Sequence, residues 1–318
     1  MVLVSVCIPC WADFSGLRES LVSLSAACKH VNPGLVQIVV GLNECDFTDQ
    51  DILAFLPADT NLSIRTGRTD GYLEYDESLE FTVNLAESDY CLLLGCGDRV
   101  LPTFAAAISS FEEMAERTDF ALFRVEANKR TFSDIGLGRF EVADPGIFNK
   151  VLSGHLFSKA ALLDALDGPR LGFLWAHIDL ALNVQGRSLK PSFEYSQAVI
   201  FRPQPEGGWW HRVDMAKQYI EYCALIETAV ELYPRLHSVR LEQKKLYGIR
   251  ILLTLAMARA NGLTEMPSFL VDWVFEKSQP KLIFTVIRLL FVLPRQVAGF
   301  FVRGLTFALA TRAALKLR

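Results

Sequence analysis

Short, unbroken apolar runs alternate with segments of helical periodicity through the first hundred residues of the chain. The runs are VLVSVCIP, VQIVVGL, LSIRT and YCLLLG. Strands that are apolar along their whole length are buried on both faces, and helices between such strands indicate a parallel sheet. We therefore predict an α/β fold with a doubly wound, mostly parallel sheet and helices on both faces. Ligands of such sheets bind beyond the C-terminal ends of the strands.

The second half of the chain continues this pattern and then changes. FALFRVEA, VLSGHLF and SFEYSQAVIF are typical of further strands, with helices predicted at 105–115 and 178–184. From 213 to 260 the apolar residues follow a helical period with no strand pattern between them. We predict three parts: an α/β domain at 1–212, a helical appendage at 213–270 and a basic amphipathic segment at 271–318.

Composition is typical of a globular protein from a reducing compartment. Hydrophobic residues make up 51% of the 318 residues and charged ones 21%, enough for a large core. The seven cysteines are odd in number and lie mostly in apolar runs, which favours free thiols. Cys7 and Cys10 have the spacing of a redox motif, but they end a strand instead of opening a helix. The N-terminus has no signal-peptide pattern, so a cytoplasmic location is expected.

Residues 271–318 have a charge balance of their own. Eight Lys or Arg accompany two acidic residues there, a balance of +6, so the remainder of this −4 chain stands at −10. At 100° per residue, Lys281, Arg288, Arg295 and Arg303 fall within a sector of about 80°, beside a wide apolar face. We predict helices that lie in the headgroup layer of an anionic membrane. Packing against the core and a spanning helix are the alternatives.

Three segments together resemble one large family of enzymes. They are VSVCIPCWADFSGLRESLVSL, QIVVGLNECDFTDQD and AESDYCLLLGCGDRVLPTFAAAISSF. Their order and spacing are similar to the inverting, nucleotide-sugar-dependent glycosyltransferases of the family 2 type. Within that type the likeness is to bacterial O-antigen and surface-polysaccharide enzymes such as the abequosyltransferases. The resemblance covers residues 2–215 and implies the GT-A fold and a nucleotide-sugar donor.

The resemblance also implies a metal site at the end of the strand YCLLLG. The family carries an Asp-X-Asp motif there, whereas this chain has Gly95-Cys96-Gly97-Asp98. Carboxylates at a strand end hold Mn²⁺ or Mg²⁺, which neutralises the charge of the departing diphosphate. We predict Asp98 as the metal ligand; a residue that caps the following turn is the alternative. Because one carboxylate replaces the motif, metal-independent transfer is also open.

Further residues are assigned to the donor by the same resemblance. The first strand and its loop hold the nucleotide base in the family, which points to Pro9 and Trp11. Trp11 either stacks on the base or covers the edge of the sheet. The Asp that usually follows the second strand aligns with Leu42, which leaves Asn43, Glu44 and Asp46 as substitutes for base recognition. A family Asn aligns with Ser78, and Asp76 lies near it. These substitutions predict an altered donor pocket.

The segment LGFLWAHIDLALNVQGRSLK resembles the place of the catalytic base in the family. The acidic pair becomes Ala176-His177 here, and the later Asp179 is retained. An inverting transfer needs one base within reach of the acceptor hydroxyl, and a histidine serves at neutral pH. We predict His177 as the base, with Asp179 orienting it or acting instead. A structural histidine before an apolar helix is the alternative.

A further set of cations lies in IFRPQPEGGWWHR. Arg202 ends a strand, and His211 and Arg212 close a loop rich in Pro and Gly. Such a loop suits a lid over a diphosphate, with the cations replacing missing metal charge. A surface loop whose tryptophans pack on the helical appendage is the alternative.

These features predict an inverting glycosyltransferase on the inner face of a bacterial cell membrane. It would move a sugar from a nucleotide-sugar donor to a lipid-linked or polysaccharide acceptor. The lost family acids favour a second reading, a catalytically silent relative that serves as a scaffold in glycan assembly. Nucleic-acid binding is not expected, because the body of the chain is acidic and the basic segment is apolar.

Overall fold

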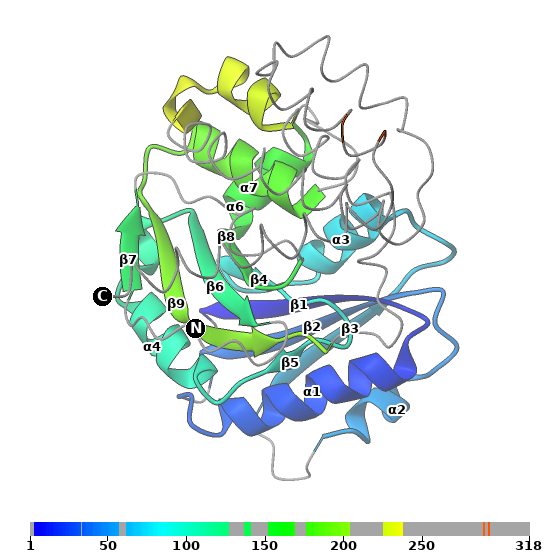
Figure 1. The fold of residues 1–318 in the computed structure, drawn as a ribbon. Coiled ribbons are helices and arrows are strands. Elements are labelled where there is room, and N and C mark those ends of the chain that lie inside the picture. The colour runs from blue at the N-terminus through cyan, green and yellow to red at the C-terminus, as the bar shows by residue number, and fades with distance from the viewer. Residues whose placement is uncertain are drawn as a thin grey trace. The chain divides into compact units, whose positions relative to one another are not determined.

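The computed structural model describes residues 3–32, 34–56, 62–126, 137–140, 152–168, 176–203, 225–237, 289 and 292. The chain divides into two compact units. The first comprises 1–204 and 231–236, and the second comprises 205–230 and 237–318. The division into 1–212, 213–270 and 271–318 stays a prediction. Everything described below lies in the first unit unless stated (Figure 1).

Four parallel strands form the first half of the sheet, in the order β3-β2-β1-β4. They are β1 (Val4–Trp11), β2 (Val36–Asn43), β3 (Ser63–Arg68) and β4 (Tyr90–Leu93). The helices that connect them are α1 (Phe14–Cys28), α2 (Asp49–Leu53) and α3 (Tyr75–Asn84). Val4 of β1 pairs with Val36 of β2 and with Tyr90 of β4, so these strands start level and end at one edge. This half confirms the expected α/β pattern.

The second half continues the same sheet with mixed directions, in the order β4-β8-β6-β9-β5. Its strands are β5 (Arg99–Val100), β6 (Phe120–Glu126), β7 (Leu137–Phe140), β8 (His155–Ser158) and β9 (Ser192–Phe201). β6 and β9 are parallel to each other, whereas β8 is antiparallel to both β4 and β6. β5 and β7 pair antiparallel with β9. The helical elements of this half are α4 (Phe104–Glu112), η1 (Ala115–Arg117), α6 (Lys159–Leu166), α7 (Ala176–Arg187) and η3 (Pro234–Leu236).

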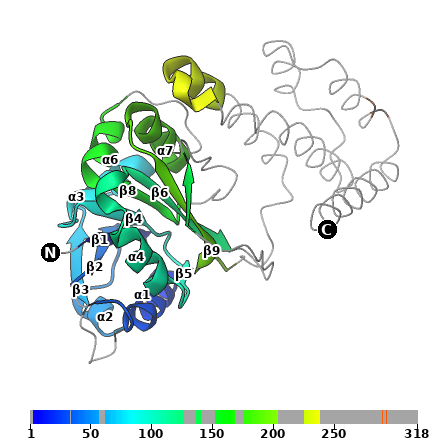
Figure 2. The same cartoon turned by 90° about the vertical axis from the view of Figure 1, so that its left-hand side faces the viewer.

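Helices cover both faces of the sheet, as the unbroken apolar strands predict. One core cluster joins α1 and α4 to the face that carries Val6 and Ile8 of β1. The other joins α3, α6 and α7 to the opposite face, which carries Cys7. Figures 1 and 2 show α1 and α4 on one side of the sheet and α3, α6 and α7 on the other. Burial of two apolar layers is the main stabilising contribution.

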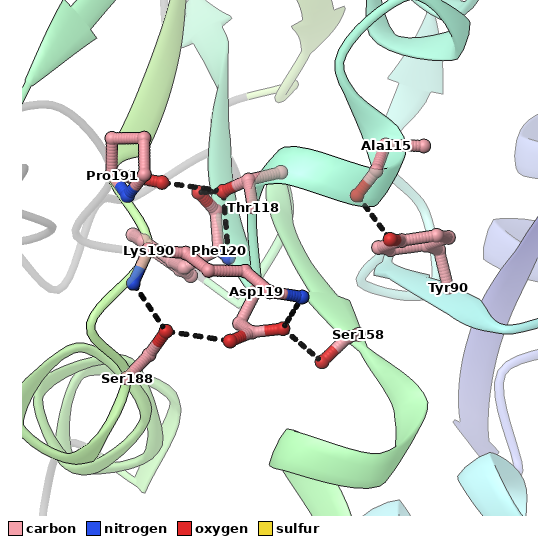
Figure 3. A network of polar contacts seen from close by, with 9 residues as sticks. All are labelled: Tyr90, Ala115, Thr118, Asp119, Phe120, Ser158, Ser188, Lys190 and Pro191. Atoms are coloured by element: carbon pink, nitrogen blue, oxygen red, sulfur yellow. Dashed lines mark hydrogen bonds and ion pairs between the residues drawn. The ribbon is translucent and has the colours of Figure 1, made fainter.

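A polar network closes the edge where β4, β6 and β9 begin (Figure 3). Asp119 accepts hydrogen bonds from Ser158 at the end of β8 and from Ser188 and Lys190 in the loop between α7 and β9. The hydroxyl of Thr118 donates to the carbonyl of Pro191 at 2.8 Å. These contacts hold the ends of α7 and β8 against the start of β6. The predicted donor-site residues lie at the opposite edge, where the parallel strands end.

Candidate active site

The C-terminal edge of the parallel strands is marked by two unusual backbone conformations. Ala12 follows β1 and Glu44 follows β2, and both have positive φ, 48° and 51°. They are the non-glycine residues with positive φ in the described part of the chain. Left-handed backbone costs energy in such residues and tends to occur at ligand sites. The strain therefore lies where ligands of this fold class bind.

The loop that follows β4 is fixed by serines from α1. Gly97 has a φ of +92°, which glycine adopts readily, and the amide of Asp98 donates to the carbonyl of Gly95 at 3.0 Å. The hydroxyl of Ser20 accepts from the amide of Gly97 and donates to the carbonyl of Asp98. Ser23 accepts from the amide of Val100 at 2.9 Å. The loop therefore presents Asp98 in one orientation.

The carboxyl group of Asp98 is buried, with 4% of the residue exposed. Ser153 donates its hydroxyl to this carboxyl group and accepts from the amide of Gly95 at 2.7 Å. Burial raises the pKa of Asp98, while the Ser153 hydrogen bond and the charge of Arg202 oppose the rise. Thr103, and not Asp98, holds the N-cap position of α4. The assignments of Asp98 as a metal ligand or as a residue of the turn both stay predictions.

Arg202 lies across from Asp98. In the β5–β9 ladder Arg99 pairs with Phe201 and Val100 with Ile200, so the next step of this antiparallel register sets Asp98 opposite Arg202. The amide of Arg202 donates to the carbonyl of Glu126 at 2.9 Å, which fixes the backbone at the end of β9. Asp98 and Arg202, predicted from separate parts of the sequence, therefore lie at one edge of the sheet, where the charge of Arg202 acts on the Asp98 carboxyl group.

Arg202 also faces the start of α3. Burial raises the pKa of the Tyr75 phenol, the charge of Asp76 adds to the rise, and the charge of Arg202 opposes it. Asp76 is half-buried in the first turn of α3. Asp76 and Arg202 therefore belong to the same edge as Asp98.

An aromatic pair stands at the end of β1. Trp11 is 63% exposed and Tyr72 is 51% exposed, and their rings meet edge to face with centroids 6.1 Å apart. The indole N–H of Trp11 donates to Glu44 at 3.4 Å. Large aromatic faces exposed at a ligand edge are available for stacking. Pro9 is two residues earlier in β1 and pairs with Gly41 of β2.

Asn43 organises the loop that carries Tyr72. Its side-chain amide donates to the carbonyl of Leu73 at 2.7 Å, and its oxygen accepts from the amide of Leu73 at 2.9 Å. Thr69 donates to the same oxygen at 3.4 Å. Asn43 is buried and contributes to the site by holding the loop that carries Tyr72.

His177 lies in the first turn of α7 and is 7% exposed. Its ring meets that of His155 edge to face, with centroids 5.1 Å apart. His155 is fully buried; its Nδ1 lies 3.0 Å from the carbonyl of Leu152, and among the described residues its Nε2 has no hydrogen-bond partner. Burial lowers the pKa of His155 to about 4. His155 is therefore neutral at physiological pH.

The segment 153–155 connects Asp98, the predicted metal ligand, with His177, the predicted base. Ser153 bonds Asp98, and His155 contacts His177. Asp179 is fully buried one turn into α7 and accepts a hydrogen bond from Asn183 at 2.8 Å. The Asn183 oxygen in turn accepts from the hydroxyl of Tyr233.

Glu194 is a further buried acid on the sheet. Leu122 of β6 pairs with His155 of β8 on one side and with Glu194 of β9 on the other, so these three residues form one row across the sheet. Burial raises the pKa of Glu194 to about 7, against the opposing charge of Arg124. Two titratable groups thus flank Leu122 on the face that α7 covers.

The edge also gathers thiols. Cys10, Cys45 and Cys96 come from the ends of β1, β2 and β4, and the six described cysteines are free. The hydrogen bond from Cys96 lowers the pKa of Cys10 despite its burial. Burial raises the pKa of Cys45 to about 11.

The described residues offer limited ligands for a divalent metal. They contain no group of three or more His, Cys, Asp or Glu side chains that could hold one. Mg²⁺ keeps several waters and is often bound through one or two carboxylates plus substrate phosphates. Asp98 would therefore supply the single protein carboxylate that is the minimum for such a site. His211 and Arg212, the other predicted donor residues, lie outside the described residues.

Solved structures show the same architecture. The S. aureus TarS fragment 1–349 in complex with UDP-GlcNAc has 14% identity and a TM-score of 0.55, with 95% of this chain and 92% of that chain covered. The GT-A fold is confirmed. A mannosyltransferase, PcManGT from Pyrobaculum calidifontis in complex with GDP-Man and Mn²⁺, has 12% identity and a TM-score of 0.56, with 94% and 86% covered. The sequence matches no protein-family model, and no curated protein matches it.

Four residues reach this site through contacts that the sequence does not show. Tyr72, Ser153, His155 and Glu194 reach the site through loop contacts or through register across strands distant in sequence. His155 does stand out in GHLFSK as a histidine that starts a buried strand. The other three carry no local signal.

Proposed function

We propose that this chain is an inverting glycosyltransferase that uses a nucleotide-sugar donor. The observation that carries the proposal is the placement of Asp98 and Arg202 one register step beyond β5 and β9 at the C-terminal edge of a GT-A sheet, where the charge of Arg202 acts on Asp98. Two opposite charges at this edge suit a diphosphate, because a guanidinium binds phosphate oxygens through paired N–H groups. Trp11 and Tyr72 supply the face on which a nucleobase stacks.

Charge develops on the diphosphate as the sugar departs. Arg202, held at the end of β9 by its bond to Glu126, neutralises part of that charge without rearrangement. A bound Mn²⁺ or Mg²⁺, with Asp98 as its protein ligand, would supply Lewis-acid stabilisation of the same oxygens. Pro9, Asn43 and Asp76 shape the donor side of the edge. His211 and Arg212 are proposed to add cations from beyond the described residues.

His177 is the proposed base for the acceptor hydroxyl. Its ring contacts the buried ring of His155 edge to face, which fixes its place at the start of α7. Asp179 accepts a hydrogen bond from Asn183 and is proposed to orient His177 or to act as the base instead. The proton that the acceptor loses passes to His177, and the new bond forms on the sugar face opposite the diphosphate.

Incubation with nucleotide sugars tests this proposal. The full chain is mixed with UDP-GlcNAc or GDP-Man and a lipid extract, and release of the nucleoside diphosphate is measured. Release that disappears in Arg202→Gln supports the proposal, and nuclear magnetic resonance of the product reports the anomeric configuration. A folded protein that releases no diphosphate from any donor contradicts it.

A catalytically silent GT-A relative that acts as a scaffold is the second candidate. It is favoured by the single carboxylate at the end of β4 and by the bond that already engages Asp179. Nucleotide binding without turnover on any acceptor would support this candidate over the enzyme.

The finer assignment concerns acceptor and place. We propose a lipid-linked or polysaccharide acceptor in bacterial surface-glycan synthesis, of the family 2 and abequosyltransferase-like kind, at the inner face of the cell membrane. No helix in the described part of the chain is long and apolar enough to cross a bilayer. The basic segment 271–318 would reach the anionic surface, and it lies outside the described residues except for 289 and 292. Sedimentation with anionic against zwitterionic vesicles tests this.

A further inference from the structure

Two thiols meet at the donor edge. The sulfur atoms of Cys10, at the end of β1, and Cys96, after β4, lie 3.5 Å apart, and Cys96 donates to Cys10. Both thiols also lie against the carbonyl of Asp13, at 3.8 Å from Cys10 and 3.5 Å from Cys96. The contact joins residues 86 positions apart in the sequence. It therefore depends on the fold and not on a local motif.

The partner of Cys10 differs from the one that its sequence spacing suggests. Cys7 belongs to the core cluster on the α7 side of the sheet, whereas Cys10 belongs to the cluster on the α1 side. The two thiols of this Cys-X-X-Cys spacing are thus separated by the sheet. Cys96, from another strand end, occupies the place of the second thiol.

The thiol of Cys96 is placed to react first with a solute, and the thiol of Cys10 is placed to react with Cys96 afterwards. Cys96 is half-buried, whereas Cys10 is buried. Cys45 approaches the backbone of the same corner, with its thiol 3.5 Å from the carbonyl of Cys10 and 3.3 Å from the amide of Ala12. A solute thus meets Cys96 first.

We propose that Cys10 and Cys96 form a reversible disulfide at the donor edge when the protein meets a small disulfide such as oxidised glutathione. The expected effect of the disulfide on donor binding rests on the proposed function, whereas formation of the disulfide does not depend on that function.

The exchange balances without any further reactant. Cys96 passes its proton along its hydrogen bond to the sulfur of Cys10, and the Cys96 thiolate attacks one sulfur of oxidised glutathione, which forms a mixed disulfide and releases one glutathione. The Cys10 sulfur then attacks the Cys96 sulfur, which forms the internal disulfide and releases the second glutathione. The two protons lost by the cysteines end on the two released thiols. The cysteines are oxidised and the glutathione disulfide is reduced.

The geometry needs a small movement. A disulfide has an S–S length of about 2.05 Å, so the sulfurs must approach by about 1.5 Å from their 3.5 Å separation. Gly95 and Gly97 flank Cys96, and Gly97 already has positive φ. Glycines absorb such a shift at low cost. Because Asp98 follows directly, the bond would draw its loop toward β1.

Oxidation should therefore alter donor binding. The loop contacts of Ser20 with Gly97 and with Asp98 would be strained when Cys96 moves toward Cys10. We expect a five-fold or greater loss of affinity for UDP or GDP in the oxidised protein, restored by dithiothreitol.

Peptide mapping tests the bond directly. The full chain is incubated with oxidised glutathione, alkylated and digested, and the linked peptides are identified by mass. The expected result is a Cys10–Cys96 cross-link in the wild type. Cys96→Ser should lose it, and Cys28→Ser should keep it, because burial raises the pKa of that isolated thiol to about 12. Glutathione retained on Cys96 without closure, or no reaction at Cys96, would overturn the proposal.

Nucleotide titration separates this inference from the proposed function. If the cross-link forms but neither reduced nor oxidised protein binds UDP or GDP, the thiol pair stands and the donor assignment fails. If the reduced protein binds nucleotide and no cross-link forms, the donor assignment stands and the thiol pair fails. Cys96→Ser keeps the backbone of the loop and should bind nucleotide equally with and without oxidant.

Discussion

Asp98 and Arg202 occupy matching positions one step beyond the two-residue ladder of β5 and β9. The ladder pairs Arg99 with Phe201, and the charge of Arg202 opposes the rise that burial causes in the pKa of Asp98. An acid at the end of β4 and a base at the end of β9 thereby share one corner of the sheet. At this corner the carboxylate of Asp98 suits a cation, and the guanidinium of Arg202 suits an anion.

Arg202→Gln should weaken nucleoside diphosphate binding about ten-fold or more, because a charge-assisted hydrogen bond contributes roughly 1.5–3 kcal/mol. Calorimetric titration with UDP and GDP measures the loss. Arg65→Gln is the matched control, since Arg65 pairs with exposed Glu87 away from this corner. Equal affinity in Arg202→Gln and wild type would remove Arg202 from the site.

Asp98→Asn should abolish the gain in affinity that Mn²⁺ confers and leave metal-free binding in place. Asparagine keeps an oxygen that accepts the Ser153 hydrogen bond, so we expect the fold to persist. Titrations with and without Mn²⁺ separate the two contributions. An unchanged Mn²⁺ effect in the variant would show that Asp98 is not a ligand.

Trp11→Ala should lower nucleotide affinity about ten-fold, within the roughly 1–3 kcal/mol that stacking of a base on an aromatic ring contributes. Loss of nucleotide-induced quenching of tryptophan fluorescence provides a second readout. Leu189→Ala truncates a more exposed apolar side chain after α7 and should bind as wild type. Full nucleotide affinity in Trp11→Ala would show that the Trp11 ring only covers the edge of the sheet.

His177→Gln should lower the rate of transfer by about 10²- to 10⁴-fold, the usual contribution of a general base, while nucleotide affinity is retained. The split between turnover and binding distinguishes a base from a structural residue. Asn183→Ala, which removes the hydrogen bond from Asn183 to Asp179, serves as a comparison and should cost less in turnover. Full activity in His177→Gln would exclude it as the base.

Buried Glu194 and His155 should give opposite pH dependences of stability. Glu194 has a pKa raised to about 7, so the folded form keeps a proton that the unfolded form loses above about pH 4.3, and stability falls across that window. The loss reaches about 3 kcal/mol. His155 has a pKa lowered to about 4, so its contribution is lost as pH falls from about 6.5 to 4.

Denaturant unfolding of two variants resolves these effects. Glu194→Gln should become more stable as pH rises from 5 to 6.5, and His155→Leu should become less stable from pH 5 to 7. The wild type, which carries both groups, should change least. Parallel pH profiles for all three proteins would contradict both assignments.

Sequence periodicity predicted the parallel half of the sheet well, because residues such as Val6 and Val39 are buried on opposite faces and leave unbroken apolar runs. It also placed Asp98 and Arg202 at strand ends. It did not show that they occupy matching positions, since that follows from the short β5 pairing with β9. Antiparallel insertion of β8 between β4 and β6 likewise depends on contacts far apart in the chain.

The most direct test of this account is calorimetric titration of the full chain with UDP, GDP and their sugar conjugates, each with and without Mn²⁺. We predict binding of at least one nucleotide, weakened by Arg202→Gln and made independent of Mn²⁺ by Asp98→Asn. Absence of binding by every nucleotide, in protein shown to be folded, would contradict the assignment of this edge as a donor site.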